Sequence, residues 1–390
     1  MARTSAYDLL LRGGHVIDPA NGIDARRDVA IRNGKIAAVD ARIAVSGATK
    51  VVDVRGKYVT PGLIDIHTHS FGYAAWTFPD EYGLPNGVTT VVDAGGAGWK
   101  NFEQFKSSII DQSQVRVLAL LNIVGAGMLG IVEQDVTEMQ HEPCAEMVKA
   151  YPDTIVGIKA AHHDGPGWES VDGAVKAGDA AGVFAMIDYH RHPKRTYKEL
   201  LLDHMRPGDV HTHMYGLHTP QFDERGKVHK FIRDARRRGV GFDVGHGGGS
   251  FWFRIAKPCM DQGFQPDTIS TDVHKGSFFL PRGTMPITMS KLINLGMPLR
   301  EAIDRSTRHA ARAINRPKLG TLSVGAEADV AVFEFETGDF GFVDSGLASM
   351  RATRRLTCHV TIRAGKALWD LNGITRPAWD KSGEYIRLPV

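Results

Sequence analysis

Hydrophobic and polar positions follow two different patterns along the chain. Near the N-terminus, short runs with β-strand character, such as 8–11 and 28–32, alternate with Gly- and Asn-containing turn signals. Runs of the same character return at 328–335 and 359–363. Between the two ends, apolar runs alternate with amphipathic stretches such as 171–181, which predict α-helices. The pattern therefore predicts an α/β middle section flanked by small antiparallel β-structure.

Eight apolar runs occupy the middle section, and their ends lie 23 to 37 residues apart. That spacing fits one strand and one helix for each run, and eight such units predict a (β/α)8 TIM barrel. Residues 61–319 have the length that such a barrel needs, about 250 residues. The flanks, 1–60 and 320–390, would combine into one discontinuous β-sandwich domain. The eight runs end near His67, Asp93, Asn122, Lys159, His190, His213, Gly245 and Asp272.

The composition is that of a globular protein without strongly charged partners. The 390 residues are 43% hydrophobic and 23% charged, which excludes a disordered or fibrous chain. A formal net charge of +3 creates no field that attracts nucleic acid or anionic lipid. The N-terminal residues 1–11 lack a signal-peptide core, and the least polar stretch, 117–132, is too short to span a membrane. We expect a cytoplasmic protein that binds neither nucleic acid nor membrane.

Residues able to bind metal ions fall at or next to the predicted strand ends, where barrel enzymes place their catalytic groups. His67 and His69 lie two positions apart, so an extended chain points both imidazoles to one side. The three cysteines are scattered without C-x-x-C spacing and are expected to be reduced thiols. Nitrogen and oxygen ligands without thiolate predict Zn²⁺ first, with Mn²⁺, Fe²⁺ or Co²⁺ as alternatives. The candidate ligands are His67, His69, Lys159, His190, His213 and Asp272.

Lys159 is the unusual member of this group, because an ammonium group cannot bind a metal ion. A lysine that is desolvated beside two cations would lose its proton and could react with CO2 to form a carbamate. The carbamate has two oxygens, so it could bridge two divalent metal ions.

Neighbouring histidines leave some of these assignments open, because predicted strand ends are uncertain by a few residues. His211 shares a face with His213, and His192 competes with His190 in the same way. His162, on the loop after the fourth strand, is either a pocket-lining or a solvated residue.

A second set of residues is placed to bind substrate. His246 and His274 lie just beyond the seventh and eighth strands, where either could hydrogen-bond a carbonyl or carboxylate group. His163 could line the pocket from the loop after the fourth strand. Arg282 could pair with a substrate carboxylate.

Several segments resemble the amidohydrolase superfamily. Residues 59–69 (VTPGLIDIHTH) are similar to its opening signature, and residues 320–330 (GTLSVGAEADV) to the segment that returns from the barrel to the β-sandwich. Residues 157–159 (GIK) resemble the carbamylated-lysine strand of the binuclear subgroup that includes dihydroorotases, hydantoinases and deacetylases. Residues 242–247, 270–274 and 285–291 are most similar to the dihydroorotase-like deacetylase branch.

The resemblance implies a role for each ligand. His67, His69 and Asp272 would hold a more buried metal ion, His190 and His213 a more exposed one, and carbamylated Lys159 would bridge both. A hydroxide shared by the metals would be the nucleophile, because metal binding can lower the pKa of water to about 7. Asp272 would act as the catalytic base and pass the proton to the leaving group. Members of this family are often homo-oligomers, so a homo-oligomer is expected here too.

One departure from the dihydroorotase pattern narrows the range of substrates that we expect. Those enzymes carry Arg two residues after the second histidine, whereas this chain reads His69-Ser70-Phe71. We therefore expect a metal-dependent hydrolase of the deacetylase or deacylase type, which cleaves an amide or ester bond of a small molecule. The alternative is a cyclic-amide hydrolase that opens a hydantoin- or dihydropyrimidine-like ring. Lys159 argues against a mononuclear aminohydrolase, and the complete ligand set argues against a non-enzymatic assembly protein.

Overall fold

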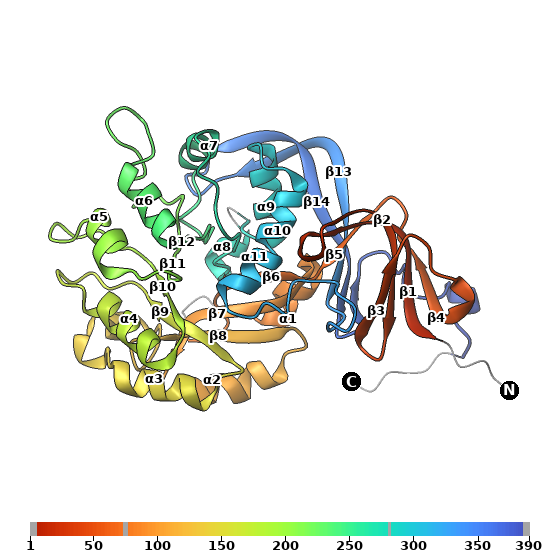
Figure 1. Cartoon of the computed structure of the whole chain (residues 1–390), viewed down its shortest axis with the longest axis horizontal. Helices are drawn as coiled ribbons and strands as arrows, with labels where there is room; N and C mark the ends of the chain where they lie inside the picture. The colour runs from red at the N-terminus through yellow and green to blue at the C-terminus, as the bar shows by residue number, and fades with distance from the viewer. Residues whose placement is uncertain (1–5, 73–76, 280–281, 385–390) are drawn as a thin grey trace.

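The computed structural model describes residues 6–72, 77–279 and 282–384. The chain forms two β-sheets that lie at opposite ends of the molecule (Figure 1). A largely antiparallel sheet, here called the terminal sheet, contains strands from both ends of the chain, and a parallel sheet surrounded by helices contains the middle. The α/β middle section and the β-structure at the ends are thus as the hydrophobic pattern predicts.

The terminal sheet has the strand order β15-β14-β13-β5-β1-β2-β3, with β4 paired to β1. The two ends of the chain meet where β5 pairs with β13, because Val59 lies opposite Val332 in an antiparallel register. Buried side chains from both ends, including Leu11, Val29 and Val360, form a hydrophobic core of their own. The strands are β1 (Tyr7–Asp18), β2 (Ile23–Arg32), β3 (Lys35–Asp40), β4 (Ala48–Asp53), β5 (Tyr58–Pro61), β13 (Val330–Val343), β14 (Ser349–Arg363) and β15 (Lys366–Asp370).

The parallel sheet has seven strands in the order β12-β11-β10-β9-β8-β7-β6, which is the reverse of their order in the chain. Strands β6 and β9 are buried along their whole length, as expected for parallel strands covered on both faces. All seven strands run in the same direction, so their carboxyl ends, where the predicted ligands lie, meet on one side of the sheet. The strands are β6 (Leu63–Thr68), β7 (Val88–Gly98), β8 (Arg116–Asn122), β9 (Ile155–Ala160), β10 (Phe184–Ile187), β11 (Val210–His211) and β12 (Gly241–Phe242).

The segment 268–273 occupies the place of the predicted eighth strand, but it makes isolated bridges instead of a continuous ladder. Asp243 pairs with Thr268 beyond β12, and Thr68 of β6 pairs with Val273. A side chain replaces one of the backbone acceptors of a regular ladder: Asp65 accepts a hydrogen bond from the Thr271 N–H at 3.0 Å. The segment therefore touches both edges of the parallel sheet, which curls around to meet it.

Helices surround the parallel sheet (Figure 1). The amphipathic stretch 171–181 falls within helix α4, which Gly182 ends in a left-handed conformation. The amphipathic stretch 299–314 forms two helices, α10 and α11, because Thr307 between them has non-helical backbone angles. The helices are α1 (Pro79–Gly83), α2 (Phe102–Ser108), α3 (His141–Ala150), α4 (Glu169–Ala181), α5 (Tyr197–Glu199), α6 (Lys230–Arg238), α7 (Phe253–Asp261), α8 (Lys275–Phe279), α9 (Met285–Asn294), α10 (Leu299–Arg305) and α11 (Arg308–Ala313).

The long hairpin of β13 and β14 links the two parts of the molecule. It extends beyond the terminal sheet toward α7 and α9 (Figure 1). At its tip, the backbone N–H of Ser345 donates to the carbonyl of Phe251 at 2.9 Å. Along its length, the backbone N–H of Leu356 donates to the hydroxyl of Ser290 on α9 at 2.9 Å. Within the described part of the chain, no helix is both long and apolar enough to cross a membrane.

Candidate metal centre

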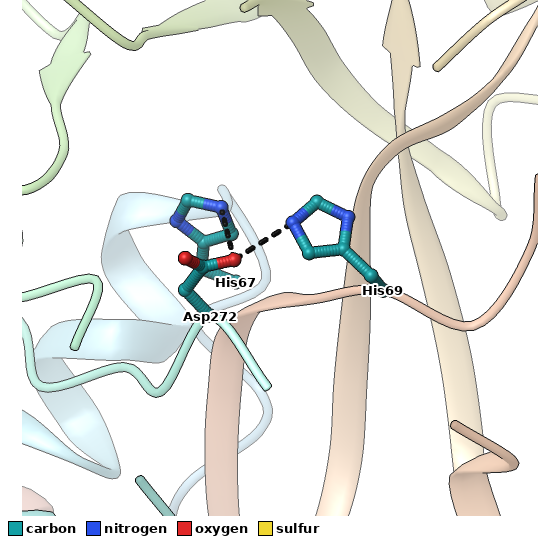
Figure 2. A group of neighbouring side chains, drawn as sticks. All are labelled: His67, His69 and Asp272. Carbon is teal, nitrogen blue, oxygen red and sulfur yellow. Dashed lines mark ion pairs between the residues drawn. The ribbon is translucent and has the colours of Figure 1, made fainter. Parts of the chain in front are cut away.

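His67, His69 and Asp272 come together at the carboxyl ends of the strands (Figure 2). His67 lies on β6, His69 follows that strand directly, and Asp272 belongs to the 268–273 segment. One oxygen of Asp272, Oδ1, lies 2.8 Å from His69 Nε2 and 3.5 Å from His67 Nε2. The exposed fractions of these three residues are at most 9%. The two imidazoles thus lie around a common carboxylate.

Lys159 and His213 lie next to this first cluster. Lys159 is fully buried near the end of β9, and its Nζ atom is 3.3 Å from Nε2 of His67. The ring of His213 lies 5.1 Å from that of His67, measured between centroids. Both residues were predicted as ligands, and the structure places both beside His67.

Asp188 forms the centre of a second cluster and was not among the predicted residues. It directly follows β10, and its side chain is only 5% exposed. Its Oδ2 atom lies 3.4 Å from His213 Nε2 and 3.9 Å from the Nε2 atoms of both His162 and His190. The ligand atoms of His162, Asp188 and His190 all lie within 4.8 Å of one another, an arrangement that could hold a metal ion.

The position of Asp188 could have been found from the sequence. The run 184–187 is entirely apolar, so Asp188 is the first polar residue after the strand. The prediction placed the strand end near His190, two residues later, and took that residue as the ligand. In the structure the His190 side chain is 34% exposed, and its Nδ1 atom lies 3.1 Å from Asp164 Oδ1. Asp188 is therefore the more buried of the two and lies closer to the rest of the centre.

Hydrogen bonds from surrounding groups orient the imidazoles. The Thr212 hydroxyl donates to Asp243 at 2.9 Å, so its oxygen accepts from Nδ1–H of His67, also at 2.9 Å. Nδ1–H of His213 donates to the carbonyl of Gly245 at 2.7 Å. Each ring therefore directs its Nε2 atom toward the clusters, which is the atom that would bind a metal ion.

The charges around these residues favour a bound cation. Nearby histidines hold the pKa of Asp188 and Asp272 below the usual range of carboxyl groups, although burial alone would raise it. Burial would lower the pKa of His213, but the Asp188 carboxylate outweighs it and raises the pKa to about 9. Burial also lowers the pKa of Lys159, against the opposing effect of Asp188 and Asp272. The carboxylates thus attract positive charge, which protons or metal ions can supply.

Three residues of the clusters adopt a backbone conformation that side chains rarely take. The φ angles of His162, His213 and Asp272 are 51°, 62° and 46°. A non-glycine residue in this left-handed region costs on the order of 1–3 kcal/mol, and such residues gather at functional sites. The strain lies at the ends of strands, where it turns these side chains toward the clusters.

The competing histidines differ in their surroundings. His211 is fully buried among hydrophobic side chains, with its ring 5.1 Å from that of Tyr197. His162 lies at the second cluster, and its Nδ1 atom is 2.9 Å from the buried Glu133 carboxylate. His192 is turned toward its own loop, where its Nδ1 atom accepts the backbone N–H of Lys194 at 3.1 Å. Of these residues, only His162 joins the clusters.

The predicted substrate-binding residues lie at different distances from the clusters. The ring of His274 is 6.4 Å from that of His69. His163 is buried, with its Nε2 atom 3.6 Å from the Glu169 carboxylate. Arg282 is exposed and lines a cavity beside α9 whose walls contain none of the clustered residues.

His246 is fully buried and held by groups of the protein itself. Nδ1–H of His246 donates to the carbonyl of Gly247 at 2.8 Å, so Nε2 accepts from the Lys291 Nζ atom at 2.7 Å. The imidazole also stacks on the ring of Phe251, with 4.8 Å between centroids. Gly247 in turn lies against Asp272, since a Cβ atom at this glycine would overlap the carboxylate. Lys291 and His246 therefore support the wall behind Asp272.

Comparison with known proteins identifies the class to which this fold and these clusters belong. Residues 253–368 match the model of the Amidohydrolase family. A deacetylase of Agrobacterium fabrum (strain C58) is 32% identical over 325 residues, which are 80% of this chain and 79% of that protein. The chain therefore belongs to the amidohydrolase family, as the sequence motifs predict, and is a hydrolytic enzyme.

Solved structures agree with this assignment. The structure of an adenine deaminase is 30% identical and superimposes with a TM-score of 0.86, covering 93% of this chain and 100% of that one. The structure of a dihydroorotase is 29% identical, with a TM-score of 0.81 and coverage of 93% and 99%. Together with the His and Asp clusters, the similarity indicates an enzyme that uses divalent metal ions.

Proposed function

We propose that this protein is a metal-dependent deacylase that hydrolyses an amide or ester bond of a small molecule. The observation that carries the proposal is the arrangement of two His and Asp clusters on either side of a buried lysine at the carboxyl ends of parallel strands. The similarity to a deacetylase over most of the chain supports the reaction class. We also propose that 61–319 closes as a (β/α)8 barrel and that 1–60 with 320–390 forms a discontinuous β-sandwich domain.

The clustered residues fit two divalent metal ions. His67, His69 and Asp272 would hold the first ion. Asp188 and His213 would hold the second, with His190 or His162 beside them. Asp188 Oδ1 is buried and accepts no hydrogen bond from the described residues, so it is available as a ligand. Zn²⁺ suits these nitrogen and oxygen donors.

Lys159 would bridge the two ions as a carbamate. It is fully buried between the clusters, and burial lowers the pKa of its amine, which favours the neutral form that reacts with CO2. The amine nitrogen lies 3.3 Å from Nε2 of His67, so it faces the first cluster directly.

Bound metal ions would polarise the scissile carbonyl and provide a hydroxide nucleophile near neutral pH. The residues of this chain supply the remaining functions. Asp272 would take the proton from the nucleophile and return it to the leaving amine or alcohol. His274 lies near His69 and is placed to hydrogen-bond the substrate carbonyl. The roles predicted for His163, His246 and Arg282 in substrate binding stay predictions.

A pooled substrate panel, followed by mass spectrometry, tests the reaction class. The pool would contain N-acyl amino acids, acetylated hydroxy acids, hydantoins and dihydropyrimidines, incubated with zinc-loaded enzyme. We expect one substrate to split into an acid and an amine or alcohol. The Asp272→Asn variant is the control and should lose this product. A single product heavier by one water would instead establish ring opening and refute the deacylase proposal.

A further inference from the structure

A cavity of about 520 Å³ lies between α9 and the β13–β14 hairpin. Its walls come from residue 278 and the segment 282–291, from β13 to β15, and from Pro85 and Asn86. None of the clustered His, Asp and Lys residues of the metal centre lines it. The volume falls within the range of small-molecule sites, about 300–1,000 Å³. The cavity is therefore a candidate ligand site apart from the metal centre.

The charged groups of the cavity are all cationic. Arg282, Lys291 and Arg355 line it, and no Asp or Glu does among the residues that the structure describes. Arg355 pairs with Glu336 at 2.7 Å outside the lining, so its charge is largely balanced. Arg282 is exposed and forms no ion pair within 4.0 Å with the residues that the structure describes. The cavity thus has an excess of positive charge.

Lys291 places a titratable amine in the wall of the cavity. Its side chain is fully buried on α9, and its ammonium lies 2.7 Å from the imidazole of His246 and 5.9 Å from the centre of the Phe251 ring. Burial lowers the pKa of Lys291 to about 7, although Asp344 opposes that shift. An anion in the adjacent cavity would stabilise the charged form of this lysine.

The rest of the lining is aromatic. Phe278, Phe340 and Trp369 contribute rings from three different elements. These rings suit a planar apolar body, and the neighbouring Arg282 suits an anionic group on it.

We propose that this cavity binds a small aromatic monocarboxylate, with its carboxylate held by Arg282 near Lys291 and its ring against the aromatic walls. Arginine suits this role because its planar guanidinium can donate two parallel hydrogen bonds to one carboxylate. The proposal adds a second ligand site to the enzyme and does not depend on the identity of the hydrolysed bond.

Isothermal titration calorimetry on the metal-loaded full chain tests the proposal with phenylacetate. Its uncharged amide, phenylacetamide, has nearly the same shape and should bind at least about tenfold more weakly, since only the carboxylate pairs with Arg282. The Arg282→Gln variant should weaken phenylacetate binding about tenfold. The Arg351→Gln variant is the matched control, because this exposed arginine of β14 pairs with Asp339 outside the cavity. Equal binding of acid and amide would overturn the proposal.

Two further variants separate the cavity from the metal centre, which can also attract carboxylates. Asp272→Asn should leave phenylacetate binding unchanged, whereas Ile287→Trp should abolish it by filling the cavity that Ile287 lines. Loss of binding in Asp272→Asn would overturn the proposal, as would unchanged binding in Ile287→Trp. Lys291→Met should weaken binding as well. If this buried substitution prevents folding, Arg282→Gln and Ile287→Trp still decide the question.

Discussion

At the scale of single residues, Asp188 gives the second cluster its negative charge. Its carboxylate lies 3.4 Å from His213 and carries a negative charge where an imidazole would be neutral. Together with Asp272 it gives the centre two carboxylates, and both attract cations more strongly than histidines would. His190, which is half-buried, lies at the edge of this cluster.

We predict that Asp188→Asn removes the second metal ion. Neutralising the carboxylate removes an anionic ligand, so metal content should fall from two ions to one per chain. The hydrolysis rate should fall about 100-fold or more, which corresponds to about 2.7 kcal/mol of transition-state stabilisation. Elemental analysis by mass spectrometry measures the metal content. His192→Gln is the control two residues beyond His190 and should keep both ions. Full metal content and rate in Asp188→Asn would contradict the assignment.

A second prediction concerns the modification of Lys159. Enzyme stripped of metal should regain activity only when divalent metal and bicarbonate are both supplied, because the carbamate needs CO2. The measurement is the recovery of the hydrolysis rate in buffers with and without CO2. Lys159→Ala should gain nothing from bicarbonate. Complete recovery in CO2-free buffer would show that the lysine acts without a carbamate.

The sequence predicts a large part of this residue-level picture but not all of it. His67 and His69 were found because their spacing fixes their direction on a strand, and Asp272 because it follows an apolar run. The environment of His246 could not be predicted, since Lys291 reaches it from a helix 45 positions away in the chain. Contacts of this kind depend on how helices pack, which periodicity does not determine.

At the scale of elements, the segments that follow the strands determine where the ligands of the metal centre lie. Gly247 follows β12 with a φ angle of 51°, and its backbone N–H donates to the Thr271 carbonyl at 2.9 Å. No side chain fits between this glycine and Asp272. The close approach of the two segments therefore fixes where the Asp272 carboxylate lies.

We predict that Gly247→Ala lowers kcat about 10- to 100-fold by displacing the Asp272 carboxylate, since small displacements of a reacting group are costly. The matched control is Gly249→Ala, because Gly249 has open space around its Cβ position and an ordinary φ angle. Steady-state kinetics should show the loss in kcat for the first variant and no change for the second. Equal kcat values in both variants would contradict the role given to Gly247.

The sequence predicts the helices of the middle section better than it predicts the pairing of the eighth strand. The stretch 171–181 forms a helix as its amphipathic pattern predicts, and Gly182 ends it. The eighth strand was expected to pair like the others, whereas 268–273 shares its hydrogen bonds with side chains such as Asp65. Apolar runs predict burial well, but burial does not determine which groups complete the hydrogen bonds.

At the scale of the whole molecule, an ion-pair network joins the parallel sheet to the terminal sheet. Arg116 of β8 pairs with Asp329 at 2.9 Å and with Glu327 beside it. Arg363 of β14 pairs with Asp329 at 3.1 Å and also with Glu327. The arginines are 17% and 15% exposed, so water screens these pairs only in part.

We predict that Arg116→Ala lowers the free energy of unfolding by about 1–3 kcal/mol, because it leaves the buried Asp329 carboxylate and the exposed Glu327 carboxylate with one cation fewer. The kcat of the metal-loaded enzyme should stay the same, since the network lies apart from the metal centre. Arg351→Ala is the control, because its pair with Asp339 is exposed and should contribute less than about 1 kcal/mol. Urea denaturation measures both, and equal losses in the two variants would contradict the role of the network.

The pairing of β5 with β13 also has a consequence for the order in which the protein can fold. One edge of β5 pairs with β1, where Val59 lies opposite Val16, but its other edge pairs only with β13, where Val59 lies opposite Val332. The first five strands therefore leave the ribosome long before the sheet can be completed. Contacts so distant in the chain slow folding, and the edge of β5 stays exposed during synthesis of the entire middle section. An exposed edge of this kind is a site for aggregation. The nascent chain should therefore depend on chaperones until β13 and β14 have been synthesised.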